Sequence, residues 1–546
     1  MSTEQDHPLA PDSDWWRGAV IYQVYPRSFQ DSNGDGIGDL AGVISRLSYI
    51  ASLGVDAIWI SPFFTSPMLD FGYDVSSYRD VDPMFGTIGD FDALIHRAHD
   101  LGLRVMIDLV LSHSSDQHRW FKESRSSRDN PKANFYVWAD AKPDGTAPSN
   151  WLSIFGGPAW EWDSERQQYY LHNFLKEQPD LNFHDPEVQQ ELLDIARFWL
   201  GKGVDGFRFD TINFYFHDQE LRDNPVLPVA ERDYSTAPEV NPYNWQDHLY
   251  DKSRPENLAF LEKMRALMDE FPAIASIGEV GDAQRSMEVI GRYTSGRRIH
   301  MCYAFEFLSG FAPPTGARFA EVLRRFEAGA PDGWACWAFS NHDVERHASR
   351  WKLNPAQMRI YLAVILSLRG SVCLYNGEEL GLPEAYVPFE DLRDPYGIRF
   401  WPKFRGRDGA RTPIPWANDN TYVGFSEVKP WLPVSVDHMS RAVSLQEADP
   451  DSTLAFYRRM LAWRRGHPAL VHGESTILEA SDTLLAYTRE HGATTVLCAF
   501  NLGDAPARLA LPAGMWRALD GTGFAANVDG AEADLPPFQA LFAERG

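Results

Sequence analysis

Cysteine is scarce in this chain of 546 residues, which contains four cysteines. They are Cys302, Cys336, Cys373 and Cys498, and they lie far apart among apolar neighbours. The sequence has no CxxC pair and no Cys/His cluster of the kind that binds zinc. We therefore expect buried free thiols in a reducing compartment rather than a disulfide framework.

Long apolar runs are also missing. No stretch approaches the ~18 uninterrupted apolar residues of a membrane span. The first residues, "MSTEQDHPLAPDSDWWRG", contain neither a basic segment nor an apolar segment, so they do not resemble a secretory signal. These absences predict a cytoplasmic protein without a membrane partner.

Basic residues are in deficit, with 51 Lys and Arg against 76 Asp and Glu, for a formal net charge of −25. A surplus of negative charge repels nucleic acid and anionic lipid, so we expect no nucleic-acid partner. Neutral ligands remain open. Aromatic residues, 13% of the chain, recur beside polar ones in "DFGYD" and "NWLSIFGGPAWEW", which suits a site that stacks on flat ligand faces.

Short apolar runs recur along residues 19–379, and amphipathic helical patterns separate most of them. Apolar strands that alternate with helices indicate parallel βαβ units, and eight such strands fit a closed (β/α)8 TIM barrel of the α/β class. A doubly wound open sheet is the alternative, but no GxGxxG motif follows any early strand. The predicted strands are 19–26, 56–63, 105–111, 203–210, 275–280, 301–307, 337–343 and 371–379, and the predicted helices include 40–54, 90–102, 186–203, 256–271 and 355–370.

The chain is too long for one ordinary core, and two changes of composition divide it. Residues 113–184 are rich in Trp, Pro, Asn and Gly and are too long for a structureless loop, so we interpret them as a subdomain inserted after the third strand. Residues 469–546 contain short strands between Gly and Asp turns, which predicts a C-terminal antiparallel β-sandwich. Residues 1–112 and 185–468 then form the barrel.

The stretch "GVDGFRFD" (203–210) puts charges into an apolar strand, where they are costly unless compensated. Strand alternation places Gly206, Arg208 and Asp210 on one side and Phe207 and Phe209 on the other, toward the helices. Asp210 ends the strand at the face where barrel active sites lie. Arg208 beside it favours the ionised carboxylate, which makes Asp210 a candidate nucleophile.

Other predicted strands also end in titratable groups. The third leads to Asp108 and His113, the fifth contains Glu279, and the seventh ends at His342 and Asp343. Apolar neighbours raise the pKa of Glu279 and keep it protonated near neutrality. A single carboxylate in such a place is often a helix cap or an ion-pair partner. An ionised carboxylate next to a protonated one is the pair that glycoside hydrolysis needs.

Several stretches together resemble the α-amylase superfamily, glycoside hydrolase family 13, and within it the bacterial α-glucosidases and oligo-1,6-glucosidases. They are "DLVLSH" (108–113), "GVDGFRFD" (203–210), "GEV" (278–280) and "FSNHD" (339–343), in the family's order, together with "QPDLN" (178–182) and "WWRGAVIYQVYPRSFQDSNGDGIGDL" (15–40). The resemblance spans essentially the whole chain.

The resemblance implies roles for individual residues. Asp210 matches the nucleophile that forms a covalent glucosyl-enzyme, Glu279 the general acid/base, and Asp343 the third carboxylate, which supports the transition state. Asp70 and Arg411 match a pair that closes the pocket around the non-reducing end, which makes the enzyme exo-acting. The residues matched to the glucose subsite are His113, Arg208, His342 and Tyr73, the last as an aromatic platform.

The segment "DSNGDGIGD" (31–39) is either an ordinary Asn-Gly/Asp-Gly turn or a cation-binding loop. It differs from an EF-hand because Gly42 stands at the twelfth position. The resemblance favours one structural divalent cation, Ca²⁺ or else Mg²⁺, and no organic cofactor. Ser112 stands where the family usually has Asn, which speaks against a second calcium site. The expected oxygen donors alternate along the loop: Asp31, Asn33, Asp35, the Ile37 carbonyl and Asp39.

Thr211, directly after the candidate nucleophile, bears on linkage. In related enzymes threonine at this position accompanies α-1,4 specificity and valine α-1,6. The resemblance therefore predicts a retaining exo-α-glucosidase of maltose-like glucosides, with sucrose or aryl glucosides as further substrates and transglucosylation as a side activity. The alternatives are an oligo-1,6-glucosidase, a dedicated transglucosidase, a sucrose- or trehalose-isomerising enzyme and, less favoured, a non-catalytic transporter subunit. Monomer and homodimer both stay open.

Overall fold

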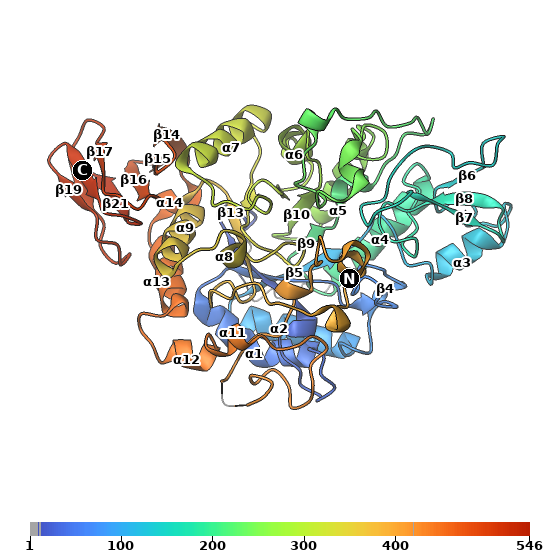
Figure 1. Cartoon of the computed structure of the whole chain (residues 1–546), viewed down its shortest axis with the longest axis horizontal. Helices are drawn as coiled ribbons and strands as arrows, with labels where there is room; N and C mark the ends of the chain where they lie inside the picture. The colour runs from blue at the N-terminus through green and yellow to red at the C-terminus, as the bar shows by residue number, and fades with distance from the viewer. Residues whose placement is uncertain (1–8, 10–11, 419) are drawn as a thin grey trace.

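Eight parallel strands form the central sheet of the computed structural model, which describes residues 9, 12–418 and 420–546. Their order is β11-β10-β9-β5-β2-β1-β13-β12, so barrel strands that follow one another along the chain lie side by side, and β1 also pairs with β13, the last of them. A bridge between Cys302 and Ala335 joins β11 to the start of β12 and nearly closes the ring. The predicted barrel is confirmed (Figure 1). The strands are β1 (Val20–Val24), β2 (Ala57–Ile60), β5 (Arg104–Leu109), β9 (Gly206–Phe209), β10 (Ala275–Val280), β11 (Met301–Ala304), β12 (Cys336–Trp337) and β13 (Ser371–Tyr375).

Helices follow the barrel strands and form an outer layer around them (Figure 1). Local sequence sets several of their starts: Asp39 caps the first, Thr87 and Asp90 form a reciprocal capping box on the second, and Asp185 precedes Pro186 at the start of the fourth. The longer helices are α1 (Leu40–Leu53), α2 (Ile88–Asp100), α4 (Pro186–Gly201), α5 (Asn257–Met268), α6 (Ser286–Thr294), α7 (Gly316–Gly329), α9 (Pro355–Ser367) and α13 (Thr453–Arg465).

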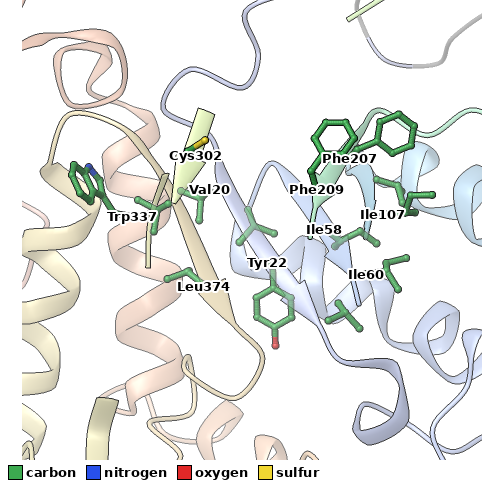
Figure 2. Close-up of a cluster of buried hydrophobic side chains, with 14 of the residues drawn as sticks. Val20, Tyr22, Ile58, Ile60, Ile107, Phe207, Phe209, Cys302, Trp337 and Leu374 are labelled. Atoms are coloured by element: carbon green, nitrogen blue, oxygen red, sulfur yellow. The ribbon is translucent and has the colours of Figure 1, made fainter. Parts of the chain in front are cut away.

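Strand alternation divides the barrel side chains into two apolar clusters. One set packs outward against the helices, and Figure 2 shows members of it, including Tyr22, Ile58, Ile107, Phe207 and Phe209. The other set fills the barrel interior with Ile21, Ala57, Trp59, Met106, Ala275, Ile277, Met301, Cys336 and Cys373. Phe207 and Phe209 therefore face the helices, as predicted, while Arg208 between them faces inward.

Two segments between barrel elements form additional small sheets. Between β5 and α4 lie α3 (Arg119–Ser126) and a three-stranded antiparallel sheet of β6 (Trp138–Ala139), β7 (Trp160–Asp163) and β8 (Gln168–Leu171). A hairpin that the sequence patterns did not predict, β3 (Phe64–Thr65) with β4 (Ser77–Val81), holds the loop that contains Asp70 and Tyr73. The seventh barrel strand is two residues long, so Asp343 lies in a loop well beyond it.

The chain ends in two antiparallel sheets at the opposite end of the long axis from β6–β8 (Figure 1). One sheet contains β14 (Glu474–Ala480), β15 (Leu484–His491), β16 (Thr494–Asn501), β21 (Ala540–Arg545) and β18 (Trp516–Ala518), and the other contains β17 (Ala507–Ala510), β20 (Glu532–Leu535) and β19 (Asn527–Asp529).

None of the helices in the described ranges combines the length and apolar character needed to cross a membrane.

Candidate active site

Arg208 lies at the centre of the inward-facing charged groups, and its side chain is fully buried. Its Nη1 lies 2.8 Å from Asp108 Oδ1 and 2.5 Å from Asp210 Oδ1, and its Nη2 lies 2.6 Å from Glu279 Oε2. Nη2 also donates to the Tyr303 hydroxyl at 2.8 Å. A buried guanidinium is tolerated when its donors are paired in this way, so the charge inside the strand is compensated by its neighbours across the sheet.

Parallel register brings these groups together. Asp108 of β5 is the register partner of Arg208 in β9, and Glu279 of β10 is the register partner of Tyr303 in β11. Asp210 follows β9 directly. Because the carboxyl ends of parallel barrel strands meet at one face, residues separated by about a hundred positions in sequence converge there.

Three carboxyl groups share the one guanidinium of Arg208, and this sets their proton affinities. Burial raises the pKa of Glu279 to about 8, against the pull of Arg208 and with the help of Asp210. The predicted raised pKa of Glu279 is thus confirmed. Burial also raises the pKa of Asp210 to about 7 despite Arg208. Arg208 lowers the pKa of Asp210, as predicted, but the expectation that Asp210 is thereby held ionised is wrong, because a guanidinium divided among several carboxyl groups does not offset the loss of water.

Asp343 lies in a more cationic environment. Its Oδ1 accepts from Arg411 Nη2 at 2.9 Å and from Arg407 Nη1 at 3.2 Å, and its Oδ2 lies 3.1 Å from His342 Nε2. Burial acts to raise the pKa of Asp343, but the guanidinium groups of Arg407 and Arg411 outweigh it and hold that pKa well below its usual range. Asp343 is therefore ionised at any pH near neutrality.

Asp70 is paired with a different arginine from the one expected. Its Oδ1 accepts from Arg407 Nη2 at 2.8 Å, whereas Arg411 donates through Nε to the His342 carbonyl at 2.7 Å and through Nη2 to Asp343. The predicted pair between Asp70 and Arg411 is corrected to Asp70 and Arg407. The two arginines lie four positions apart in one loop, and only its tertiary path decides which of them faces Asp70.

Tyr73 stacks on His342, with ring centroids 5.3 Å apart and an interplanar angle of 4°. The Tyr73 hydroxyl lies 3.0 Å from Asp108 Oδ2 and 2.6 Å from His342 Nε2. Gln23 Nε2 lies 2.8 Å from the other ring nitrogen of His342, and burial lowers the pKa of this imidazole well below its usual value. The ring is thus neutral with its proton on Nε2, which orients Tyr73.

Thr211 contacts the carboxyl groups of both Asp210 and Glu279. Its backbone N–H donates to Glu279 Oε2 at 3.1 Å, and its hydroxyl donates to Asp210 Oδ2 at 3.1 Å. Its φ of 40° and ψ of 45° lie in the left-handed region, which costs a β-branched residue about 1–3 kcal/mol. Tertiary contacts must hold this conformation, and one of them is the hydroxyl of Ser112, 2.9 Å from Thr211 Oγ1.

His113 joins the same group from the loop after β5. Its Nδ1 lies 2.8 Å from Ser112 Oγ, and its Nε2 lies 3.0 Å from the Tyr73 carbonyl oxygen and 3.2 Å from Gln178 Nε2. Burial lowers the pKa of His113 to about 4, so the ring is neutral. All ten residues predicted for catalysis or substrate binding thus belong to one connected network of contacts.

The members of this network that sequence reasoning missed include Tyr303, Gln178, Arg407 and Asp394. Tyr303 occupies an inward position of a predicted strand, and Gln178 begins the "QPDLN" stretch, so both had a signal. Arg407 and Asp394, which are 2.8 Å apart, lie in the irregular region 380–440, where no periodicity marks a side chain. Only the folded path of this region over the barrel shows that Arg407 and Asp394 belong to the site.

The loop 31–39 lies apart from this network. Asp31, Asn33 and Asp35 each accept the backbone N–H two residues on, at 3.0, 3.0 and 2.8 Å, and Asp39 caps α1 through Gly42. Burial acts to raise the pKa of Asp31, but hydrogen bonds from Ser426 and loop amides outweigh it, so this carboxylate is ionised. Among the described residues, no group of three or more His, Cys, Asp or Glu side chains could hold a metal ion. The cation stays a prediction.

Two family models match the chain. One, described as alpha amylase, catalytic domain, covers residues 23–473, and the other, a domain of unknown function (DUF3459), covers residues 472–540. The chain belongs to the alpha-amylase family. The resemblance drawn from the sequence motifs is thereby confirmed, and the chain is an enzyme of the glycoside hydrolase class.

Relatives within the alpha-amylase family are similar along their whole length. A probable alpha-glucosidase of Rhizobium meliloti is 62% identical over 544 residues, which cover 98% of each chain. An oligo-1,6-glucosidase of Heyndrickxia coagulans is 36% identical and aligns over 93% of this chain and 96% of its own. The solved structure of an alpha-glucosyl transfer enzyme, XgtA, is 53% identical, covers 97% of this chain and 99% of its own, and superposes with a TM-score of 0.95.

Proposed function

We propose that this protein is a retaining α-glucosidase in which Asp210 is the nucleophile and Glu279 the general acid/base. The contact that carries the proposal is the shared guanidinium: Arg208 holds Asp210 at 2.5 Å and Glu279 at 2.6 Å through its two terminal nitrogens. Because one guanidinium contacts both carboxyl groups, Asp210 and Glu279 lie on either side of the same side chain and near each other. This supports the retaining arrangement, in which the carboxyl groups are about 5–5.5 Å apart, over the inverting one.

In the proposed reaction an Asp210 oxygen attacks the anomeric carbon while the glycosidic bond breaks and Glu279 gives its proton to the leaving oxygen. Glu279, now a carboxylate, then removes a proton from water, which attacks the anomeric carbon and releases α-glucose and free Asp210. The raised pKa of Glu279, about 8, keeps its proton available at neutral pH. Ionised Asp343 lies beside the site and stabilises the positive charge that develops on the sugar, whereas the Arg208 guanidinium favours the ionised form of Asp210.

The proposed substrates are short α-1,4-glucosides of the maltose type, attacked from the non-reducing end. The ion pair between Asp70 and Arg407 supports the exo mode, because it joins two loops beside Asp343. Thr211, whose hydroxyl contacts Asp210, supports the α-1,4 linkage. The relatives named alpha-glucosidase are in line with this assignment.

A dedicated transglucosidase is the second candidate, because the structural relative with a TM-score of 0.95 is named an alpha-glucosyl transfer enzyme. Both candidates share the covalent intermediate and differ in the acceptor that resolves it. The ratio of free glucose to transfer products at low and high acceptor concentration separates them. A ratio that stays far below one at low acceptor concentration would favour the transglucosidase.

The deciding experiment is time-resolved proton NMR with equal concentrations of maltose and isomaltose. We expect α-glucose to appear first, from maltose, with isomaltose barely consumed. Asp210→Asn should lose about 10⁴-fold or more in turnover while its thermal unfolding stays close to that of the wild type. Release of β-glucose first, or substantial activity in Asp210→Asn, would overturn the assignment of the nucleophile.

We further propose that loop 31–39 binds one divalent cation, Ca²⁺ or Mg²⁺, in a structural role. The support is the alternation of oxygen donors at Asp31, Asn33 and Asp35 and an Asp31 carboxylate held ionised. Gly34 and Gly36 adopt φ values of 78° and 88°, which permit the tight turn that such loops require. The loop is anchored to the segment 425–431 through Ser426, so a bound cation would stiffen that anchor.

A further inference from the structure

Ser112 lies between two residues of the site and contacts both. Its side chain is 1% exposed, and its Oγ lies 2.8 Å from His113 Nδ1 and 2.9 Å from Thr211 Oγ1. The Thr211 hydroxyl in turn donates to Asp210 Oδ2 at 3.1 Å. Two hydroxyl groups thus connect the His113 imidazole to the oxygen of Asp210 that Arg208 does not contact.

When Asp210 is ionised, the number of available protons fixes the direction of this series of hydrogen bonds. A hydroxyl has one proton, so when Thr211 donates to Asp210 it must accept from Ser112, and Ser112 must then accept from His113 Nδ1–H. His113 Nε2 is left as an acceptor. Gln178 supplies the donor there: its Oε1 accepts from the Leu175 N–H, so its amino group faces His113 Nε2 at 3.2 Å.

The opposite direction is satisfied as well. If Asp210 is protonated, its carboxyl donates to Thr211, Thr211 to Ser112, and Ser112 to His113 Nδ1. The proton of the neutral ring then lies on Nε2, where the Tyr73 carbonyl oxygen accepts it at 3.0 Å. Because both an acceptor and a donor lie beside His113 Nε2, this nitrogen has a hydrogen-bond partner in either direction.

We propose that Ser112 and Thr211 form a two-hydroxyl relay whose direction follows the protonation of Asp210, and that Ser112 is a positioning residue for the Thr211 hydroxyl. The proposal rests on the function proposed above, in which Asp210 is the nucleophile. With Asp210 ionised, Ser112 fixes the Thr211 hydroxyl toward Asp210 Oδ2 and leaves the carboxylate in one orientation. The relay also restrains Thr211 in its left-handed conformation, in which the Thr211 backbone N–H donates to Glu279.

Other groups around Asp210 also influence its protonation, and a test must separate them from the relay. Arg208 comes from its own strand, and the remaining titratable groups that face it are Asp108, Glu279, Asp343, Tyr73, Tyr78 and Tyr215. The side chains of these groups contact neither of the two relay hydroxyls, which bind His113, each other and Asp210. Substitutions that change only hydroxyl groups therefore leave these charges in place.

The test is a double-mutant cycle read from the pH dependence of kcat/KM for maltose. Ser112→Ala should shift the acid limb to higher pH and lower kcat/KM below it by about fivefold to tenfold, because the carboxylate loses a fixed donor. Thr211→Val, which keeps the β-branched shape, should give a similar shift, and Thr211→Ser, which keeps the hydroxyl, should not. In the Thr211→Val background, Ser112→Ala should have no further effect on the acid limb.

Ser276→Ala is the matched control. Ser276 is equally buried and its Oγ lies 2.9 Å from His300 Nδ1, but this pair is at the start of β10, away from the site. It should leave the acid limb unchanged. Ser112→Cys serves if Ser112→Ala does not fold, since a thiol is close in size and a weak donor, and it should shift the limb partway.

Additive effects of Ser112→Ala and Thr211→Val, an unshifted limb in Ser112→Ala, or an equal shift in Ser276→Ala would each overturn the relay. The proposed function fails separately, through an active Asp210→Asn variant. An inactive Asp210→Asn variant together with an additive cycle would leave the nucleophile assigned and remove only the relay.

Discussion

Arg407 Nη2 donates to Asp70 Oδ1 at 2.8 Å across 337 positions of sequence. The same guanidinium contacts Asp394 at 2.8 Å and Asp343 at 3.2 Å, so one buried side chain joins the loop of the β3–β4 hairpin to two later loops. Arg407 is 7% exposed, and Asp70 and Asp394 are 4% and 0% exposed. This ion-pair network is therefore shielded from water and from salt, unlike the ion pairs at the surface.

Replacing Arg407 by Met should lower the free energy of unfolding by about 3–5 kcal/mol, because it leaves buried carboxylates without their counter-charge. Urea denaturation followed by circular dichroism measures this loss. Arg197→Met is the control: Arg197 and Glu270 form a two-contact pair whose side chains are 49% and 52% exposed. An exposed pair contributes about 0–1 kcal/mol, so equal losses in the two variants would contradict the prediction.

The pH profile of kcat/KM should be bell-shaped, with its optimum between about 7 and about 8. Asp210 must be ionised to attack, so activity rises as the pH passes its pKa of about 7. Glu279 must be protonated to act as an acid, so activity falls as the pH passes its pKa of about 8. Initial rates at low maltose concentration define both limbs. The Glu279→Gln variant, assayed with an aryl glucoside that has a good leaving group, should show no alkaline limb in the pH profile of the glucosylation step. A wild-type optimum near pH 5 would refute the assignment.

Glu378 should make the protein less stable at alkaline pH. It is 3% exposed, and burial raises its pKa to about 8, far above the value it has when unfolded. A raised acid pKa stabilises the fold most below the unfolded pKa of about 4.5, and this stability is lost as the pH rises toward 8. The wild type should therefore lose about 2–4 kcal/mol more of its unfolding free energy between pH 5 and pH 8.5 than Glu378→Gln loses over the same interval. Glu288→Gln, at an exposed pair with Arg292, should show no such difference.

Saturating Ca²⁺ or Mg²⁺ should raise the thermal midpoint of unfolding, and a chelator should lower it, if loop 31–39 binds a cation. Binding at 100 times the dissociation constant stabilises by about 2.7 kcal/mol. Asp35→Ala should abolish the difference without changing kcat on maltose. Asp144→Ala is the control, since Asp144 also accepts the N–H two residues on, in an exposed turn without alternating donors. A cation effect that persists in Asp35→Ala would locate the site elsewhere.

The sequence by itself determined the features that depend on local order. A strand repeats every two residues, so "GFRFD" alone places Phe207 and Phe209 on one side and Arg208 on the other. Asp39, Thr87 and Asp185 mark helix starts through contacts within a few residues. The barrel follows from repetition of these local patterns, and the strand ends converge because all eight strands run in parallel.

Only the tertiary structure decided the features that depend on distant neighbours. The choice between Arg407 and Arg411 as the partner of Asp70 depends on how an irregular loop crosses the barrel, which no period in the sequence encodes. The pKa of Asp210 rose where its neighbour Arg208 alone predicted a fall, because proton affinity depends on all the groups that share the guanidinium and on the water that packing removes. Ser112 and Thr211 lie 99 positions apart, and their contact exists only after β5 and β9 have paired.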